Sequence, residues 1–105
     1  MNDRELLKMA AKTMGGDAVW TDIDGNLYAG DPEELWNPLD NDGDAFRLAV
    51  KLSICIQFIP GCDTAQVYQE RDNGDAFNVH VAGLGDIETR RIITKAAAEI
   101  GKAMP

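Results

Sequence analysis

The chain has 105 residues, of which 45% are apolar and 27% are charged, and its formal net charge is −8. These proportions are ordinary for a globular protein and exclude a wholly disordered chain, and the length suits one domain. We therefore expect a single α+β domain over residues 1–105. The strongest apolar run, Ile54 to Pro60, is too short to cross a bilayer.

The negative charge is concentrated in one stretch of the chain. Between Thr13 and Phe46 there are nine acidic residues and no Lys or Arg. The acids are Asp17, Asp22, Asp24, Asp31, Glu33, Glu34, Asp40, Asp42 and Asp44. Nucleic-acid binding needs positive charge to neutralise phosphates, so this pattern disfavours DNA, RNA and anionic membranes as direct partners.

The first half of the chain predicts one helix and one hairpin. Residues 2–14 carry apolar side chains at helical spacing, with Asn2 as the expected cap. Short strands are expected at residues 18–22 and 26–29, joined by the Asp24-Gly25 turn. Residues 30–41 are expected to form a loop because they include two prolines, with Trp36 and Leu39 pinning it to the core.

The second half predicts two helices around three strands. A helix over residues 43–53 is expected to start at an Asp cap, and residues 54–59 are apolar enough for a central strand. Strands at 65–71 and 76–82 flank the turn signal Asn73-Gly74, with Asn78 and His80 on the wet face. A last helix is expected over 87–103, capped by Asp86.

The predicted order is thus α-β-β-α-β-β-β-α. Hairpin connections favour a mostly antiparallel sheet, here of four or five strands, with the helices packed on it. An uncovered face or edge of this sheet leaves a monomer and a homodimer both open.

Five segments, together 32 of the 105 residues, carry a resemblance: Asn2–Leu7, Trp36–Leu39, Asp42–Leu52, Thr89–Ile93 and Ala96–Gly101. They resemble small uncharacterised phage and prophage proteins related to the phage α-β-α (ABA) sandwich domain family. The resemblance implies an accessory protein that acts in a bacterial host cytoplasm. It implies no catalytic residues.

The residue patterns that could indicate a metal site or a catalytic site are weak. Asp22, Asp24 and Asn26 resemble the start of a calcium loop, but Leu27 stands where the sharp turn needs glycine, so a hairpin turn is the better interpretation. Asp40, Asp42 and Asp44 offer the same start, and there Lys51 stands where the last ligand is needed. A close pair of carboxylates can act as acid and base, as in glycosidases, but with nine acids in one segment such pairs arise by chance.

The remaining candidates are equally weak. Cys55 and Cys62 are expected to be free thiols, a cross-hairpin disulfide being the alternative, and the chain lacks the ligands for a zinc site. Cys55 and His80, the only histidine, could form a nucleophile pair across the sheet, although an inert thiol beside a surface imidazole is favoured. The loop Gly83-Leu84-Gly85 lacks the third glycine of a phosphate-binding loop. No cofactor is predicted.

The acidic segment therefore supports a non-enzymatic interaction module. Aromatic residues among acids are typical of protein interfaces, since aromatics anchor and charges steer the encounter. The expected face, which would bind a basic surface of a host protein, comprises Trp36, Asp31, Glu33, Glu34, Asp40, Asp42 and Asp44. Whether Trp20 and Trp36 belong to the core or to the interface stays open. The alternative is a small ligand-binding protein or enzyme with a pocket between sheet and helix.

Overall fold

The structure, a computed structural model, describes residues 2–17, 20–21, 26–29 and 34–105. Its helices are α1 (Asp3–Ala11), α2 (Asp42–Lys51) and α3 (Asp86–Lys102), with 3-10 helices η1 (Lys12–Asp17) and η2 (Pro60–Cys62). Its strands are β1 (Trp20–Thr21), β2 (Leu27–Ala29), β3 (Glu34–Leu35), β4 (Cys55–Ile59), β5 (Thr64–Glu70) and β6 (Ala76–Gly83). The α+β class is as predicted.

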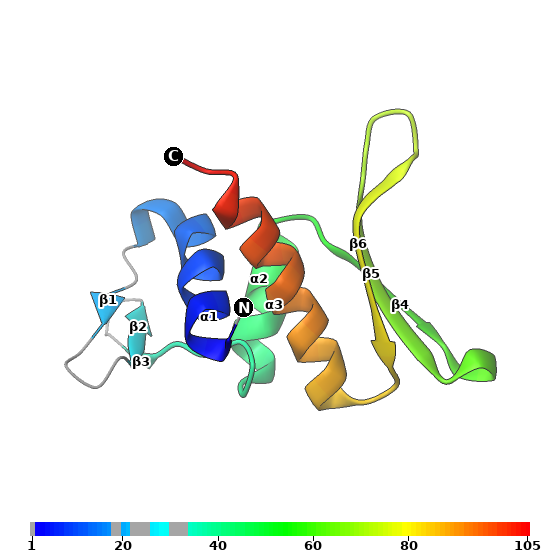
Figure 1. Cartoon of the computed structure of the whole chain (residues 1–105), viewed down its shortest axis with the longest axis horizontal. Coiled ribbons are helices and arrows are strands. Elements are labelled where there is room, and N and C mark those ends of the chain that lie inside the picture. Colours follow the sequence, from blue (N-terminus) through cyan, green and yellow to red (C-terminus); the bar gives the residue numbers. More distant parts are fainter. Residues whose placement is uncertain (1, 18–19, 22–25, 30–33) are drawn as a thin grey trace.

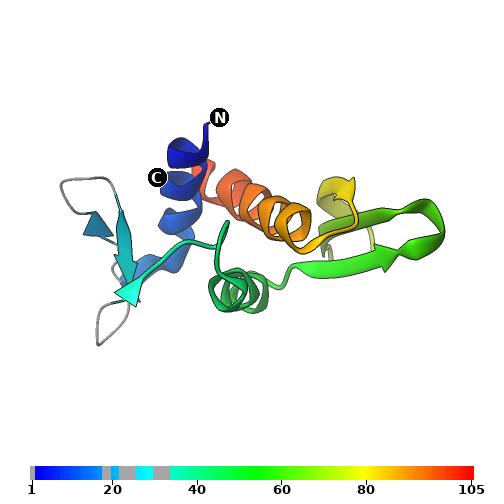
Figure 2. The same cartoon turned by 90° about the horizontal axis from the view of Figure 1, so that it is seen from below.

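The single sheet of four or five strands is wrong. The described residues form two antiparallel sheets of three strands each, in the orders β1-β2-β3 and β4-β5-β6. The sheets lie at opposite ends of the molecule with the three helices between them (Figures 1 and 2). Helix α2 separates the two halves of the chain, and in each half the strands pair with their neighbours in the sequence.

The cap residues set the beginnings of the first two helices. Asn2 accepts a hydrogen bond from the Glu5 N–H at 2.8 Å, as predicted. The α-helix ends at Ala11, before the predicted end at Met14. The chain then continues in 3-10 turns to Asp17. For α2 the cap is Asn41, not an aspartate, and its side chain accepts from the Asp44 N–H at 2.9 Å.

The last helix is the centre of the core. Ile92, Ile93, Ala96, Ala97 and Ala98 are all at most 3% exposed, because α1, α2, β5 and β6 surround α3. Gly85 precedes the helix without a side-chain cap, so Asp86 is its first residue and not its cap.

Residues 34–41 are more ordered than a loop. Glu34 and Leu35 pair with β2 as β3, and the Trp36 N–H donates to the Leu27 carbonyl oxygen at 2.7 Å. The Trp36 side chain is 4% exposed and belongs to the core cluster, so the expected pinning of this segment is confirmed for Trp36, whereas Leu39 is only partly buried. The predicted Asp24-Gly25 turn lies outside the described residues.

The second sheet differs from its prediction in two ways. Among the described strands β4 pairs only with β5 and forms an edge, so the predicted central position of this strand is wrong. In β6 the register shifts at Asn78, which has a φ of 53°, so one residue of β5 faces two of β6. This bulge turns His80 toward the helices and leaves Val79 and Val81 in solvent, so the predicted wet face is wrong. The Asn73-Gly74 turn is confirmed, with Gly74 at a φ of 87°.

Candidate binding groove

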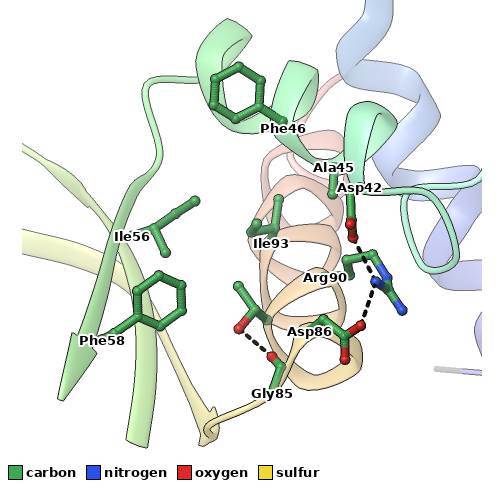
Figure 3. A pocket seen from close by; sticks show the side chains of 10 residues that line it. Asp42, Ala45, Phe46, Ile56, Phe58, Gly85, Asp86, Arg90 and Ile93 are labelled. Atoms are coloured by element: carbon green, nitrogen blue, oxygen red, sulfur yellow. Dashed lines mark hydrogen bonds and ion pairs between the residues drawn. The ribbon is translucent and has the colours of Figure 1, made fainter. Parts of the chain in front are cut away.

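An open groove of about 440 Å³ lies between the inner face of β4 and the helices α2 and α3 (Figure 3). It exists because α3 packs against β5 and β6, whereas β4 at the edge receives little cover from any helix. Ile56 and Phe58 face the same side as the fully buried Val67 and Ala65, their partners in β5. The groove is therefore an extension of the core that the helices leave uncovered.

Apolar side chains form most of the groove. They are Ala45, Phe46, Ile56, Phe58 and Ile93. Phe46 from α2 and Phe58 from β4 face the hollow from two elements and are 65% and 55% exposed (Figure 3). Large apolar groups gathered in one open hollow are unusual in a monomer, because each costs free energy when it stays in water.

Charged groups close one end of the groove. Arg90 donates from Nη1 to the Asp42 carboxylate at 2.7 Å and from Nε to the Leu39 carbonyl oxygen at 2.9 Å. Asp86 lies 3.6 Å from the same Nη1. The hydrogen bond to Asp42 is the main cause that raises the pKa of Arg90, so this guanidinium stays charged. The Arg90 side chain thus ties the segment before α2 to α3.

The outward potential at this end of the groove is negative. The side chain of Arg90 is only 14% exposed, whereas those of Asp42 and Asp86 are 81% and 78% exposed. Two carboxylates therefore face solvent above one partly buried cation. This end can accept a further cation from a bound partner.

The residues that line the groove supply no catalytic pair. They include neither His nor Cys nor Ser, and the Thr89 hydroxyl already donates to the Gly85 carbonyl oxygen at 2.6 Å. The groove can therefore bind an apolar group, but its lining offers no nucleophile with an adjacent base.

The structure distributes the predicted acidic face over different environments. Asp44 is 6% exposed, where it accepts from the Asn37 N–H at 2.9 Å and from Arg47 at 2.7 Å. Trp36 is a core side chain, and Asp42 is paired with Arg90 at the groove. Glu34 and Asp40 are exposed, and Asp31 and Glu33 lie outside the described residues.

A second hollow, of about 390 Å³, brings part of the predicted face together. Trp36, Asp40 and Asp44 line it beside Leu35 and Asn37. Its acids already have partners, since Asp40 accepts from Asn37 at 3.3 Å and Asp44 from Arg47. Trp36 therefore stabilises the fold at this place, and the alternative of Trp36 as an exposed anchor is not what the structure shows. The side chain of Trp20 is not among those described.

The weak chemical candidates are separated by the fold. Cys55 pairs with Tyr68 and His80 pairs with Val67, so the two side chains point to opposite faces of the sheet. Cys55 and Cys62 are both free thiols. The carboxylate of Glu88 lies against Gly85 at the start of α3, where a phosphate would have to bind.

Two absences hold for the described part of the chain. In it, no cluster of His, Cys, Asp and Glu is arranged to hold a metal ion. Asp22 and Asp24 of the calcium pattern lie outside that part. None of its helices is long and apolar enough to cross a membrane.

Sequence reasoning offered a pocket between sheet and helix only as its alternative and did not identify the apolar residues that line the groove. One signal was present: Phe46 and Val50 are apolar residues four apart in α2, outside the buried stripe of Ala45, Leu48 and Ala49. Such an extra apolar pair on a helix that already has a core face indicates a second contact surface.

Fold and groove together define a small α+β protein with an open apolar groove between an edge strand and two helices. Comparisons of the chain with known protein families, with curated proteins and with solved structures find no match.

Proposed function

We propose that the protein is a non-enzymatic interaction module that binds a segment of another protein in the groove between β4, α2 and α3. The resemblance to phage and prophage proteins supports the further proposal that the module acts in a bacterial cytoplasm on a host protein with a basic surface. The observation that carries the proposal is the exposure of Phe46 and Phe58 in one open hollow.

The size and chemistry of the groove fit this role. Its volume of about 440 Å³ lies within the range of roughly 300–1,000 Å³ that is typical of small-molecule binding sites. Aromatic side chains in a desolvated contact supply most of the energy of protein interfaces, about 2 kcal/mol or more for each main anchor. The excess acidic charge favours encounter with basic surfaces over acidic ones.

The acidic face beside β3 takes a smaller part in this proposal than the sequence suggested. Asp44 is buried and accepts hydrogen bonds inside the fold, and Asp42 lines the groove. Glu34 and Asp40 remain as the exposed acids near Trp36. Reversing all of Asp40, Asp42 and Asp44 would damage the fold and would not test a docking surface. The groove variants below avoid that ambiguity.

The test compares two exposed side chains of the same sheet. Phe58 lines the groove, whereas Val81 is 60% exposed on the opposite face. Native protein, Phe58→Ser and Val81→Ser serve as baits in a bacterial lysate, and the retained protein is then purified and titrated by calorimetry. We expect at least a tenfold loss of affinity for Phe58→Ser and less than a twofold change for Val81→Ser. Equal affinities for the three proteins would refute the groove as the binding site.

A small apolar ligand is the second candidate, because the groove volume also suits one. Native mass spectrometry of the protein from its expression host would show an added mass that Phe58→Ser loses. That result, with no protein retained by the native bait, would favour ligand binding over protein binding.

A further inference from the structure

In the described part of the chain, the edge of β4 beside the groove is unpaired. β4 pairs with β5 through five consecutive residue pairs, and no strand of the described chain lies on its other side. In an antiparallel pair, alternate residues direct their N–H and C=O groups away from the partner strand. Within the described part of the chain, residues 55–59 make no backbone hydrogen bonds outside their own sheet. These outward groups are open to another strand.

The two edges of this sheet differ in their protection. Natural edge strands are blunted by lysine, proline, short length or a bulge. On β6 the bulge at Asn78 interrupts the edge. β4 has a regular register and the uncharged sequence Cys-Ile-Gln-Phe-Ile, and the first proline follows only at position 60. The open edge is therefore the one that borders the groove.

A strand added to β4 would use the groove directly. It would lie about 4.8 Å from β4, with alternate side chains on the same face as Ile56 and Phe58. That face points to α2 and α3, and Phe46 faces the hollow from α2 (Figure 3). The added strand would gain main-chain hydrogen bonds from the edge and apolar burial from the groove, the combination by which sheet edges recognise extended peptides.

Charge decides what kind of strand fits. A second copy could offer its own β4, but two chains of net charge −8 repel each other. The exposed carboxylates of Asp42 and Asp86 stand at the polar end of the groove, where both approach Arg90 (Figure 3). A segment with a Lys or Arg beside its apolar residues satisfies both features. Charge complementarity thus favours a different, basic partner.

The geometry points to strand addition: β4 accepts an extended segment of a basic partner protein as a fourth strand. Apolar side chains at alternate positions of that segment fill the groove, and a flanking Lys or Arg binds Asp42 and Asp86. This inference rests on the proposed function and specifies the form of the bound segment.

The probes are synthetic ten-residue peptides in which phenylalanine alternates with threonine. One peptide carries two lysines at its amino end, and a second carries them at its carboxyl end. A third is the lysine peptide that binds more tightly, with glutamates in place of its two lysines. Two further versions of the lysine peptide that binds more tightly are N-methylated, one at the odd and one at the even positions. Binding to the full-length native protein, Phe58→Ser and Val81→Ser is followed by amide NMR and hydrogen exchange.

We expect one lysine peptide to bind the native protein and Val81→Ser alike, and Phe58→Ser at least tenfold more weakly. Bound peptide should slow amide exchange within residues 55–59. One N-methylated register should bind at least tenfold more weakly than the other, because only one set of peptide N–H groups faces β4. The glutamate peptide should bind at least fivefold more weakly than its lysine counterpart.

Three results would overturn strand addition. Equal binding by both N-methylated registers would show that the groove takes side chains without strand pairing. A dimer with protected residues 55–59 in the absence of peptide would show that a second copy occupies the edge. Absence of binding by every peptide at millimolar concentration would also refute it. In the first of these cases the loss of partner binding by Phe58→Ser would still hold, so the proposed function would survive.

Discussion

Gly101 in α3 packs against the backbone carbonyl of Met9 in α1. A β-carbon at position 101 would overlap the Met9 carbonyl oxygen and crowd its carbon. The contact brings the two helix backbones together at the point where α3 ends. The absence of a side chain at position 101 is what permits this approach, since Gly101 itself is buried.

We therefore expect Gly101→Ala to destabilise the protein by at least about 2 kcal/mol, since overpacking against a backbone group forces the helices apart. Helix propensity alone would favour alanine by about 1 kcal/mol, so the sign of the change tests the contact. Urea unfolding measures it. Gly83→Ala is the control, because nothing lies within 4 Å of the added carbon there. Equal stabilities for both variants would contradict the close approach.

The buried carboxylate of Asp44 should matter more to stability than its exposed neighbour Asp40. Asp44→Ala removes the acceptor of the Asn37 N–H and of Arg47, which should cost about 1.5–3 kcal/mol. Asp40→Ala loses one long hydrogen bond at the surface and should change stability by less than about 0.5 kcal/mol. Thermal and urea unfolding of the two variants at the same pH would check the order, and the reverse order would be inconsistent with the structure.

The end of α2 contains a residue in an unfavourable backbone conformation. Ser53 has a φ of 53° and follows the helix in a Schellman arrangement, where Ile54 donates to the Ala49 carbonyl at 2.8 Å. Glycine avoids the roughly 1–2 kcal/mol cost of this conformation but loses more chain entropy on folding. Ser53→Gly should thus gain about 0.5–1 kcal/mol, whereas Ser53→Ala should not. A gain by alanine equal to that by glycine would argue against this cap.

Protonation of His80 should destabilise the fold. Burial lowers the pKa of His80, with Glu99 opposing and Lys95 adding to the shift. Asn78 donates through Nδ2 to Gln69 and to the Ala96 carbonyl, so its Oδ1 accepts from the Nε2–H of His80 at 2.9 Å, a bond that the ring can make in either charge state. The unfolded chain binds the proton at higher pH than the folded one, so stability falls as pH drops through about 6.5.

The measurement for this pH effect is the difference in urea midpoint between native protein and His80→Gln from pH 7.5 to 5.0. Glutamine keeps a donor for Asn78 but does not titrate in this range. The native protein should lose stability relative to the variant as the pH falls. A constant difference would show that the imidazole does not titrate differently in the two states.

Phe58 should contribute to binding and little to folding. Since its side chain is 55% exposed, Phe58→Ser should lower stability by less than about 1 kcal/mol. Leu48→Ala, at a fully buried position, should cost about 2–5 kcal/mol. Comparable losses in calorimetric unfolding would mean that Phe58 is a core residue and would weaken the groove proposal.

Local signals predicted the helices and one hairpin well. Asn2 caps α1, and Asn73-Gly74 turns between β5 and β6, because both depend on residues close in the chain. The sheet arrangement depends on which strand finds which partner, and nothing local in β4 separates an edge strand from a central one. Its largely apolar sequence, interrupted only by Gln57, suggested burial, whereas in the structure Ile56 and Phe58 line an open groove.

The bulge at Asn78 explains another error of the sequence reasoning. Strict alternation placed Phe77, Val79 and Val81 on one buried face, but the extra residue moves Val79 and Val81 to the opposite side from Phe77. A periodicity of two cannot reveal where a strand gains a residue.

The site depends on contacts that are remote in sequence, such as the one between Arg90 and Asp42. These residues are 48 positions apart and meet only because α2 packs against α3. The acidic segment was visible in the sequence, but the separate roles of Asp42 at the groove and Asp44 in the interior were not.

The bulge in β6 also determines how far an assembly could grow. A sheet with two open edges accepts strands on both sides, and repeated addition leads to fibres. Here one edge is interrupted, so a strand that joins β4 finds no second site on the other side of the sheet. Binding at β4 should therefore produce complexes of fixed one-to-one stoichiometry. A protein whose sheet had two open edges would extend a growing sheet, whereas this protein should end it.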